Sequence, residues 1–283
     1  MVERRPWLDR LAHAVLIAGG AVIAFPLYVA FVASSQSSEQ MHRVPMSLWP
    51  GTEFLANFKT VLLGAGDTTG STAMGHMLWV TLVMALGVAW GKIAISMLSA
   101  YAIVYFRFPL RQTCFWLIFV TLMLPVEVRI SPTYKIVADL GLLNSYGGLI
   151  LPLIASATAT FLFRQFFMTV PDELVEAARM DGAGPLRFLK DVLVPLSATN
   201  IAALFVIQFI YGWNQYLWPL LVTTDEAMYP IALGLKRSIG AGGDAAIEWQ
   251  LVMATAVLTM VPPALVVLAM QRWFVKGLVD SEK

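Results

Sequence analysis

Residues 168–195 read MTVPDELVEAARMDGAGPLRFLKDVLVP, and no other internal segment of the chain is as rich in charge. The first half predicts a helix, because Pro171 suits the first helical position and Asp172 and Glu173 suit the positive end of the helix dipole. Gly182 then suits the position just after a helix, where a left-handed residue costs least. The quoted stretch therefore predicts a short polar helix that ends in a sharp turn.

The second half of the stretch predicts another short helix. Pro185 can begin it, and we expect Pro195 to end it. One face of the first helix carries the small residues Ala177 and Ala178, which permit close approach of another surface. Together the two halves predict a helix–turn–helix that lies outside the membrane.

On both sides of this stretch the chain consists of long apolar runs. A helix needs about 20 mostly apolar residues to span a bilayer, and six runs meet this requirement. They are Leu11–Ala33, Met77–Phe106, Gln112–Ile130, Leu149–Phe167, Ile201–Thr223 and Trp249–Gln271. We therefore expect an all-α, polytopic membrane protein with six transmembrane helices.

The composition supports a membrane protein. Hydrophobic residues make up 58% of the chain and charged residues 13%, with a mean hydropathy of +0.72, whereas soluble domains contain about a quarter charged residues. The net charge of +1 argues against a nucleic-acid partner. Cys114 is the single cysteine, which excludes an intrachain disulfide, and we interpret it as a packing residue.

The distribution of Lys and Arg predicts the orientation. Most of the 19 basic residues fall on one side of the membrane when both termini are placed in the cytoplasm, as the positive-inside rule requires. Residues 168–195 then lie in the cytoplasm, and the long polar connection Ser34–Gly75 is an exposed external loop. We expect residues 1–75 to form the first helix and this loop, and residues 76–283 a core of five helices.

Motifs for enzymatic chemistry are missing from the sequence. Gly87-Val88-Ala89-Trp90-Gly91-Lys92 lacks the spacing and the following Ser or Thr of a phosphate-binding loop. His13, His42 and His76 are scattered, and no metal-binding or nucleophile motif occurs. We therefore predict no catalytic residues, no metal site and no bound cofactor, so ATP hydrolysis would have to come from another subunit.

The quoted stretch resembles the "EAA" signature of ABC importer permeases. The residues that carry the resemblance are Glu176, Ala177, Ala178, Asp181, Gly182, Ala183, Val192, Val194 and Pro195. In that family the signature forms the coupling helix, which docks into a groove of the ATPase subunit. The resemblance places this coupling helix at about 168–195 of the present chain. The resemblance implies this role for Glu176 to Ala178 and Asp181 to Ala183, within the type I ABC importer permease fold.

The similarity extends from about residue 77 to the C-terminus and points to the carbohydrate-uptake branch of these binding-protein-dependent permeases. Within it, the chain is similar to permeases of bacterial sn-glycerol 3-phosphate importers, which in turn resemble the smaller maltose permease subunit. The supporting stretches are FPLYVAF at 25–31, LPVEVRI at 124–130, FLFRQFF at 161–167, WNQYLWP at 213–219 and GLVDSEK at 277–283. Sugars or polyols remain alternative substrates of a related importer.

The resemblance implies an assembly in the bacterial inner membrane. It contains this subunit, a second permease as heterodimer partner, two copies of an ATPase that use ATP and Mg²⁺, and a periplasmic or extracytoplasmic binding protein. Membrane lipid surrounds the spans. The rival class is a secondary transporter, which would need ion-coupling carboxylates within the spans, and the spans contain almost no acidic residues.

Three polar residues within the apolar runs are candidates for the substrate pathway. Lys92 is a cation inside a span, where a charge costs roughly 2.5–3.5 kcal/mol, and Asn214 and Gln215 lie in the fifth run. Each has a second interpretation: Lys92 can pair with a carbonyl or pack between helices, and the two amides can form hydrogen bonds between helices. We expect Gly87 and Gly91 to allow tight packing inside the subunit.

Overall fold

The computed structural model describes residues 6–64, 73–121, 124, 126–240 and 247–280, and these residues form helices and connections without a strand. Two compact units are present. One contains residues 1–76 and 234–261, and the other contains residues 77–233 and 262–283. The predicted division of the chain after residue 75 stays a prediction.

The first unit contains the N-terminal helix and a structured connection. Its helices are α1 (Pro6–Ser34), α2 (Ser38–Met41) and α3 (Phe54–Leu63), together with the first part of α15 (Trp249–Asp280). The Asn57 side chain of α3 donates to the carbonyls of Ser34 and Gln36, both at 2.9 Å. These bonds satisfy carbonyls at the end of α1. The described part of the predicted loop, residues 34–64 and 73–75, therefore contains two short helices fixed to the end of α1, while most of its residues are exposed as we expected.

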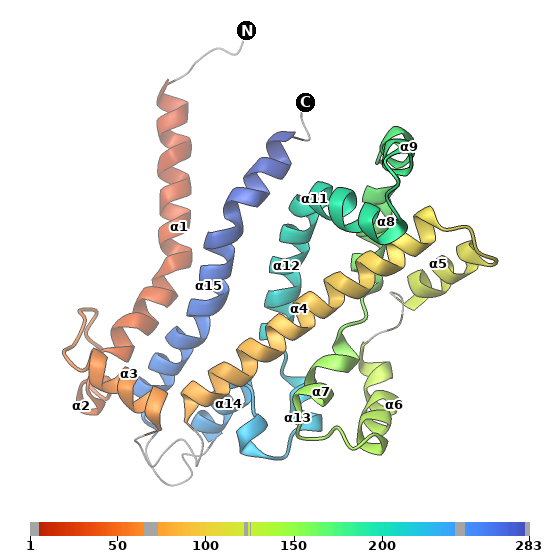
Figure 1. Ribbon diagram of the computed structural model, residues 1–283. Helices are drawn as coiled ribbons and strands as arrows, with labels where there is room; N and C mark the ends of the chain where they lie inside the picture. The colour runs from red at the N-terminus through yellow and green to blue at the C-terminus, as the bar shows by residue number, and fades with distance from the viewer. Residues whose placement is uncertain (1–5, 65–72, 122–123, 125, 241–246, 281–283) are drawn as a thin grey trace. The chain divides into compact units, whose positions relative to one another are not determined.

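The second unit is organised around one long helix, α4 (Met74–Tyr105), drawn in gold in Figure 1. The elements that follow are α5 (Arg111–Val120), α6 (Val126–Asp139), α7 (Tyr146–Ile150), the 3₁₀ turn η2 (Leu151–Leu153), α8 (Ala157–Phe167), α9 (Asp172–Met180), α10 (Pro185–Phe188), the π-helical turn η3 (Leu189–Leu193), α11 (Val194–Leu196), α12 (Ala198–Trp213), α13 (Leu217–Val222), the 3₁₀ turn η4 (Glu226–Met228) and α14 (Ile231–Gly240).

Two apolar clusters of described residues lie in the core of this unit, and α4 contributes to both. Val80, Met84 and Val88 in its first half pack with Val137, Leu149 and Trp218 from α6, α7 and α13. Farther along α4, Ile93, Met97 and Ala100 pack with side chains of α8 to α12. Gly212 of α12 lies so close to α4 that a Cβ placed on it would stand 2.9 Å from the Ala85 Cα atom. The backbones of α4 and α12 thus approach closely, as small residues permit in membrane helices.

The described residues contain three continuous helices that are long and apolar enough to cross a membrane, Arg10–Ser34, Met74–Tyr105 and Trp249–Gln271. Two bent pairs also qualify, Tyr146–Leu153 with Ala157–Phe167 at 49° and Pro185–Leu196 with Ala198–Trp213 at 76°. This gives up to five spans rather than the predicted six.

The predicted third span, Gln112–Ile130, is not one helix. Its residues are divided between α5, which ends at Val120, and α6, which begins at Val126. The sequence places Pro125 between the two helices, and proline both lacks an N–H donor and disfavours helical geometry at the residue before it. Apolar composition predicted a continuous span here because hydropathy does not register such a break.

Candidate functional site

The helix α9 ends in a tight backbone turn at Gly182. The N–H of Gly182 donates to the Arg179 carbonyl at 3.0 Å, and the N–H of Ala183 donates to the Ala178 carbonyl at 2.9 Å. Gly182 has φ +72°, in the left-handed region. These two bonds and the left-handed glycine form a Schellman motif. The helix and its glycine end therefore form as the sequence predicted, with Pro171 one residue before the first helical position.

The six predicted coupling residues divide between the interior and the surface. Ala178 is buried in the apolar cluster with α4, α8 and α10, and Ala183 packs partly buried against the same cluster. The exposed members are Glu176, Ala177, Asp181 and Gly182. Two of the small residues thus anchor the turn, and the other four residues present a surface to solvent.

Two tyrosines of α4 donate hydrogen bonds to the chain on either side of α9. Tyr105 donates its hydroxyl hydrogen to the Phe167 carbonyl at 3.2 Å, just before the segment begins. Tyr101 donates to the Pro185 carbonyl at 2.8 Å, just after the Gly182 turn. Because both donors belong to one helix, α9 and its turn are attached to the end of α4 at two points.

The second half of the segment ends within one residue of the predicted position. The last helical turn, α11, runs to Leu196, one residue after Pro195, and Ser197 donates its N–H to the Leu193 carbonyl at 2.9 Å. The chain then bends by 76° before α12. A proline ring normally clashes with the carbonyl four residues earlier. The π-helical turn Leu189–Leu193 lies directly before Pro195 and widens the backbone there.

Lys92 lies at the crossing of α4 and α12. It is 6% exposed, and its Nζ atom donates to Gln208 Oε1 at 3.0 Å and lies 3.6 Å from the centre of the Tyr211 ring. These contacts agree with the interpretation in which Lys92 packs between helices. They also place its positive charge beside Tyr211, which lines a cavity.

Gly87 and Gly91 permit close packing inside the subunit, as we expected. A Cβ on Gly87 would meet the Ile150 side chain at 2.7 Å, and a Cβ on Gly91 would collide with the Ile154 side chain. Both neighbours belong to the bent segment that begins with α7. The side chains of Ile150 and Ile154, in the same subunit, therefore pack against both glycines.

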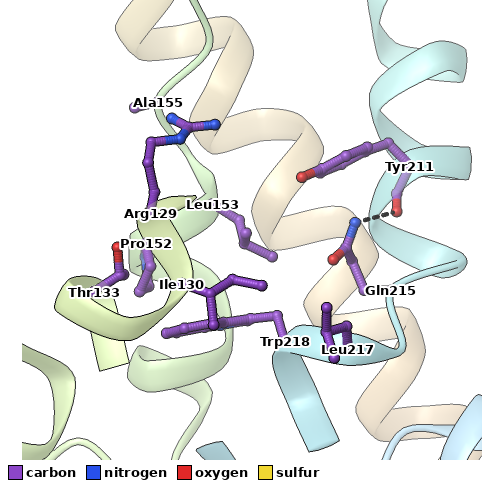
Figure 2. A pocket seen from close by; sticks show the side chains of 10 residues that line it. All are labelled: Arg129, Ile130, Thr133, Pro152, Leu153, Ala155, Tyr211, Gln215, Leu217 and Trp218. Carbon is purple, nitrogen blue, oxygen red and sulfur yellow. Dashed lines mark hydrogen bonds between the residues drawn. The ribbon is translucent and has the colours of Figure 1, made fainter. Parts of the chain in front are cut away.

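The cavity beside Tyr211 is shown in Figure 2, and its volume is about 130 Å³. It brings Gln215, one of the predicted pathway residues, together with residues of α6 and of the α7–α8 connection. Gln215 Nε2 donates to the Tyr211 carbonyl at 3.2 Å. Asn214 is exposed at the end of α12 and does not line this cavity.

Gln208 and Tyr211 were not predicted as polar partners, and Arg129 was not among the predicted pathway residues. Arg129 lines the cavity with Thr133, which follows it by one helical turn in α6. The four-residue spacing of Tyr211 and Gln215 within an apolar run could have predicted that the two side chains lie on the same side of the chain. The described residues contain no group of three or more His, Cys, Asp or Glu side chains that could hold a metal ion.

Comparison with known proteins identifies the family. Residues 92–280 match the model of the family described as "Binding-protein-dependent transport system inner membrane component". This chain belongs to that family. The permease resemblance predicted from residues 168–195 is thereby confirmed.

Individual relatives and one solved structure extend this result. The permease is 57% identical to the sn-glycerol-3-phosphate transport system permease protein UgpE of Brucella melitensis and 59% identical to that of Escherichia coli, with 100% of both chains covered in each case. It matches a solved chain from a bacterial ABC transporter involved in import of the acidic polysaccharide alginate, with a TM-score of 0.79 and 21% identity, over 97% of this chain and 99% of the other. This similarity shows the fold.

These findings fix the general role of the permease. It is a multi-pass inner-membrane subunit of an ABC importer and a transport protein rather than an enzyme. Such a permease works with a partner permease, an ATPase and a substrate-binding protein. The expected all-α permease fold is confirmed, while the expectation of six continuous spans is not.

Proposed function

We propose that this chain is the permease subunit of an ATP-driven importer of sn-glycerol 3-phosphate, with glycerophosphodiesters as further substrates. The observation that carries the proposal is the identity of 57% and 59%, over the full length of both chains, to relatives named for sn-glycerol 3-phosphate transport. Identity at this level over the full length supports the same class of substrate for this importer and for those of the two relatives.

Within this importer, the turn at the end of α9 receives force from the ATPase. Glu176, Ala177, Asp181 and Gly182 form its docking surface, and Ala178 and Ala183 fix that surface to the core. Support comes from the exposed apolar side chains beside them, since Met180 is 89% exposed and Leu186 is 77% exposed. Exposed apolar groups around a rigid turn suit a protein partner.

The assembly contains one copy of this chain, one second permease, two ATPase subunits and an extracytoplasmic binding protein. Both termini and α9 lie in the cytoplasm. This chain binds no cofactor, and ATP and Mg²⁺ are used by the ATPase pair. Closure of that pair moves α9, and α4 moves with it because of the tyrosine bonds, so the pathway alternates between its inward-open and outward-open states. Nucleotide at one end and the loaded binding protein at the other bias this two-state equilibrium.

Substrate-stimulated ATPase activity of the reconstituted importer tests the assignment. We expect sn-glycerol 3-phosphate and glycerophosphodiesters to stimulate hydrolysis in the presence of the binding protein, and maltose to have no effect. Stimulation by maltose or by a neutral polyol, without stimulation by the phosphate compounds, would refute sn-glycerol 3-phosphate as the substrate and favour the related sugar or polyol importer.

The orientation has a separate test. In a Cys114→Ser background, Met180→Cys introduces one exposed thiol at the end of α9. A membrane-impermeant maleimide should label it in inside-out vesicles and leave it unlabelled in right-side-out vesicles. The opposite labelling pattern would place α9 on the external side and exclude the coupling role.

A further inference from the structure

Two parts of the chain, α6 and the end of α12 with the residues after it, each direct a pair of polar side chains at the cavity of Figure 2. Arg129 and Thr133 lie one turn apart on α6. Tyr211 lies in the last turn of α12, and Gln215 lies two residues beyond its end, bonded to the Tyr211 carbonyl. Residues separated by four positions share one face of a helix. The phenol of Tyr211 extends from α12 toward the α6 side of the cavity in Figure 2.

The walls between these pairs are apolar and well fixed. Trp218 forms part of the lining and donates its indole N–H to the Gly148 carbonyl at 3.0 Å. Pro152 and Leu153 from η2 close another side. Polar groups that converge within apolar walls are typical of ligand sites.

The charge in this region is positive. Arg129 lines the cavity directly, and the ammonium group of Lys92 lies 3.6 Å from the centre of the Tyr211 ring. None of the lining residues, within the part of the chain that the structure describes, is acidic. Guanidinium groups bind phosphate oxygens through paired, charge-assisted hydrogen bonds.

We propose that this cavity is the subsite that holds the phosphate group of the transported solute, with Arg129 as its main donor. Thr133 and Tyr211 supply hydroxyl donors, and Lys92 adds positive charge through its contact with Tyr211. This inference rests on the proposed function, because the solute must be an organic phosphate. A volume of about 130 Å³ is small for a complete ligand site, for which roughly 300–1,000 Å³ is typical. The cavity therefore takes the head group, and the glycerol part lies outside it.

The test uses the complete importer in proteoliposomes, with ATP and saturating binding protein. Uptake of sn-glycerol 3-phosphate is compared for wild type, Arg129→Gln, Arg129→Lys and Thr133→Val. Lys135→Gln is the matched control, since Lys135 is an exposed cation of α6 that does not line the cavity. Assembly is checked by co-purification of the ATPase, and folding by the ATPase rate without binding protein.

Arg129→Gln should lower the uptake rate about 10- to 100-fold, the range for losing hydrogen bonds to a charged group. Arg129→Lys should recover part of this loss, because it keeps the charge and loses the paired geometry. Thr133→Val should lower uptake several-fold, and Lys135→Gln should match wild type. A merely structural role for Arg129 would change the ATPase rate without binding protein, which we expect to stay unchanged.

Uptake by Arg129→Gln within twofold of the Lys135→Gln control would overturn the subsite. If Arg129→Gln fails to assemble, Thr133→Val decides, and wild-type uptake by that variant overturns the inference. Failure of the wild-type importer to take up sn-glycerol 3-phosphate would instead refute the proposed function, so the two failures are distinguishable.

Discussion

Replacing Gly182 with valine should uncouple this permease from its ATPase. No described atom lies within 4 Å of a Cβ built on Gly182, so the Cβ itself causes no clash and the main effect of the substitution is on the backbone. Its φ of +72° costs an ordinary L-residue roughly 1–2 kcal/mol. If the turn rearranges to relieve this strain, the two hydrogen bonds at 3.0 and 2.9 Å are also lost, each worth about 0.5–1.5 kcal/mol.

The backbone strain of valine alone lowers the equilibrium constant that favours the intact turn by roughly tenfold, since about 1.4 kcal/mol corresponds to a factor of ten. The two hydrogen bonds favour the intact turn to the same extent in wild type and variant, so they do not add to this change. We expect ATP-dependent uptake of sn-glycerol 3-phosphate in proteoliposomes to fall by a similar factor. Ligand binding by the separate binding protein should remain normal. The assay is initial uptake rate per assembled complex, measured beside ATP hydrolysis.

Two variants control for this prediction. Gly182→Asn should retain most uptake, because asparagine tolerates the left-handed region. Gly184→Ala should behave as wild type, because Gly184 has φ −69° and no described atom within 4 Å of its Cβ position. Equal uptake by the valine and asparagine variants, at equal abundance, would refute the argument from backbone geometry.

Three further predictions concern the interior of the second unit. Gln208→Leu should lower the free energy of unfolding of the solubilised complex by about 1–3 kcal/mol, because the Lys92 ammonium loses its acceptor. Adding Lys92→Met should recover much of this loss in a double-mutant cycle. The double variant Tyr101→Phe with Tyr105→Phe should lower the solute transported per ATP hydrolysed while assembly persists, because both attachments of the α9 segment to α4 are lost. Gly91→Leu should cost roughly 1–3 kcal/mol of stability by overpacking, measured by thermal unfolding in detergent.

Each of these predictions has a control and a contradicting result. A double variant no more stable than Gln208→Leu alone would exclude direct coupling of Lys92 and Gln208. Tyr134→Phe changes an exposed tyrosine of α6 and is the control for the double tyrosine variant. If Tyr134→Phe lowers the solute transported per ATP hydrolysed as much as that double variant does, the effect is not specific to the two attachments. Gly19→Ala, where a Cβ meets no described atom within 4 Å, should leave stability unchanged, and wild-type stability of Gly91→Leu would contradict the packing argument.

The α9 turn could be predicted from the sequence because its determinants are local. Acidic residues at the helix start and Gly182 after its end act within one or two helical turns. The continuous spans α4 and α15 were predictable for a similar reason, since apolar length alone specifies them. The third and fifth runs are divided between two helices each, α5 and α6 in the third and α12 and α13 in the fifth. Average hydropathy over about 20 residues predicted one span in each case, because it gives little weight to single residues such as Pro125 and Asn214.

The cavity could not be assembled from the sequence because its residues are distant in the chain. Arg129 and Tyr211 come from different helices, and Lys92 pairs with Gln208 across 116 positions. Such contacts arise from the crossing of α4 and α12, which depends on Gly212 meeting Ala85. Periodicity within one helix cannot reveal which faces meet.

The π-helical turn Leu189–Leu193 allows the chain before α12 to hold one residue more without a large change of direction. Val194 donates its N–H to the Leu189 carbonyl, five residues earlier, so this turn holds one residue more than an α-turn. An extra residue wound into a regular α-helix would rotate everything before it by about 100°, whereas the wider turn takes up the extra residue within itself. Deleting one of the five residues should therefore restore ordinary winding and leave Met180 and Leu186 facing nearly the same side. This position can thus gain or lose one residue at little cost to the direction of the surface that we propose for the ATPase.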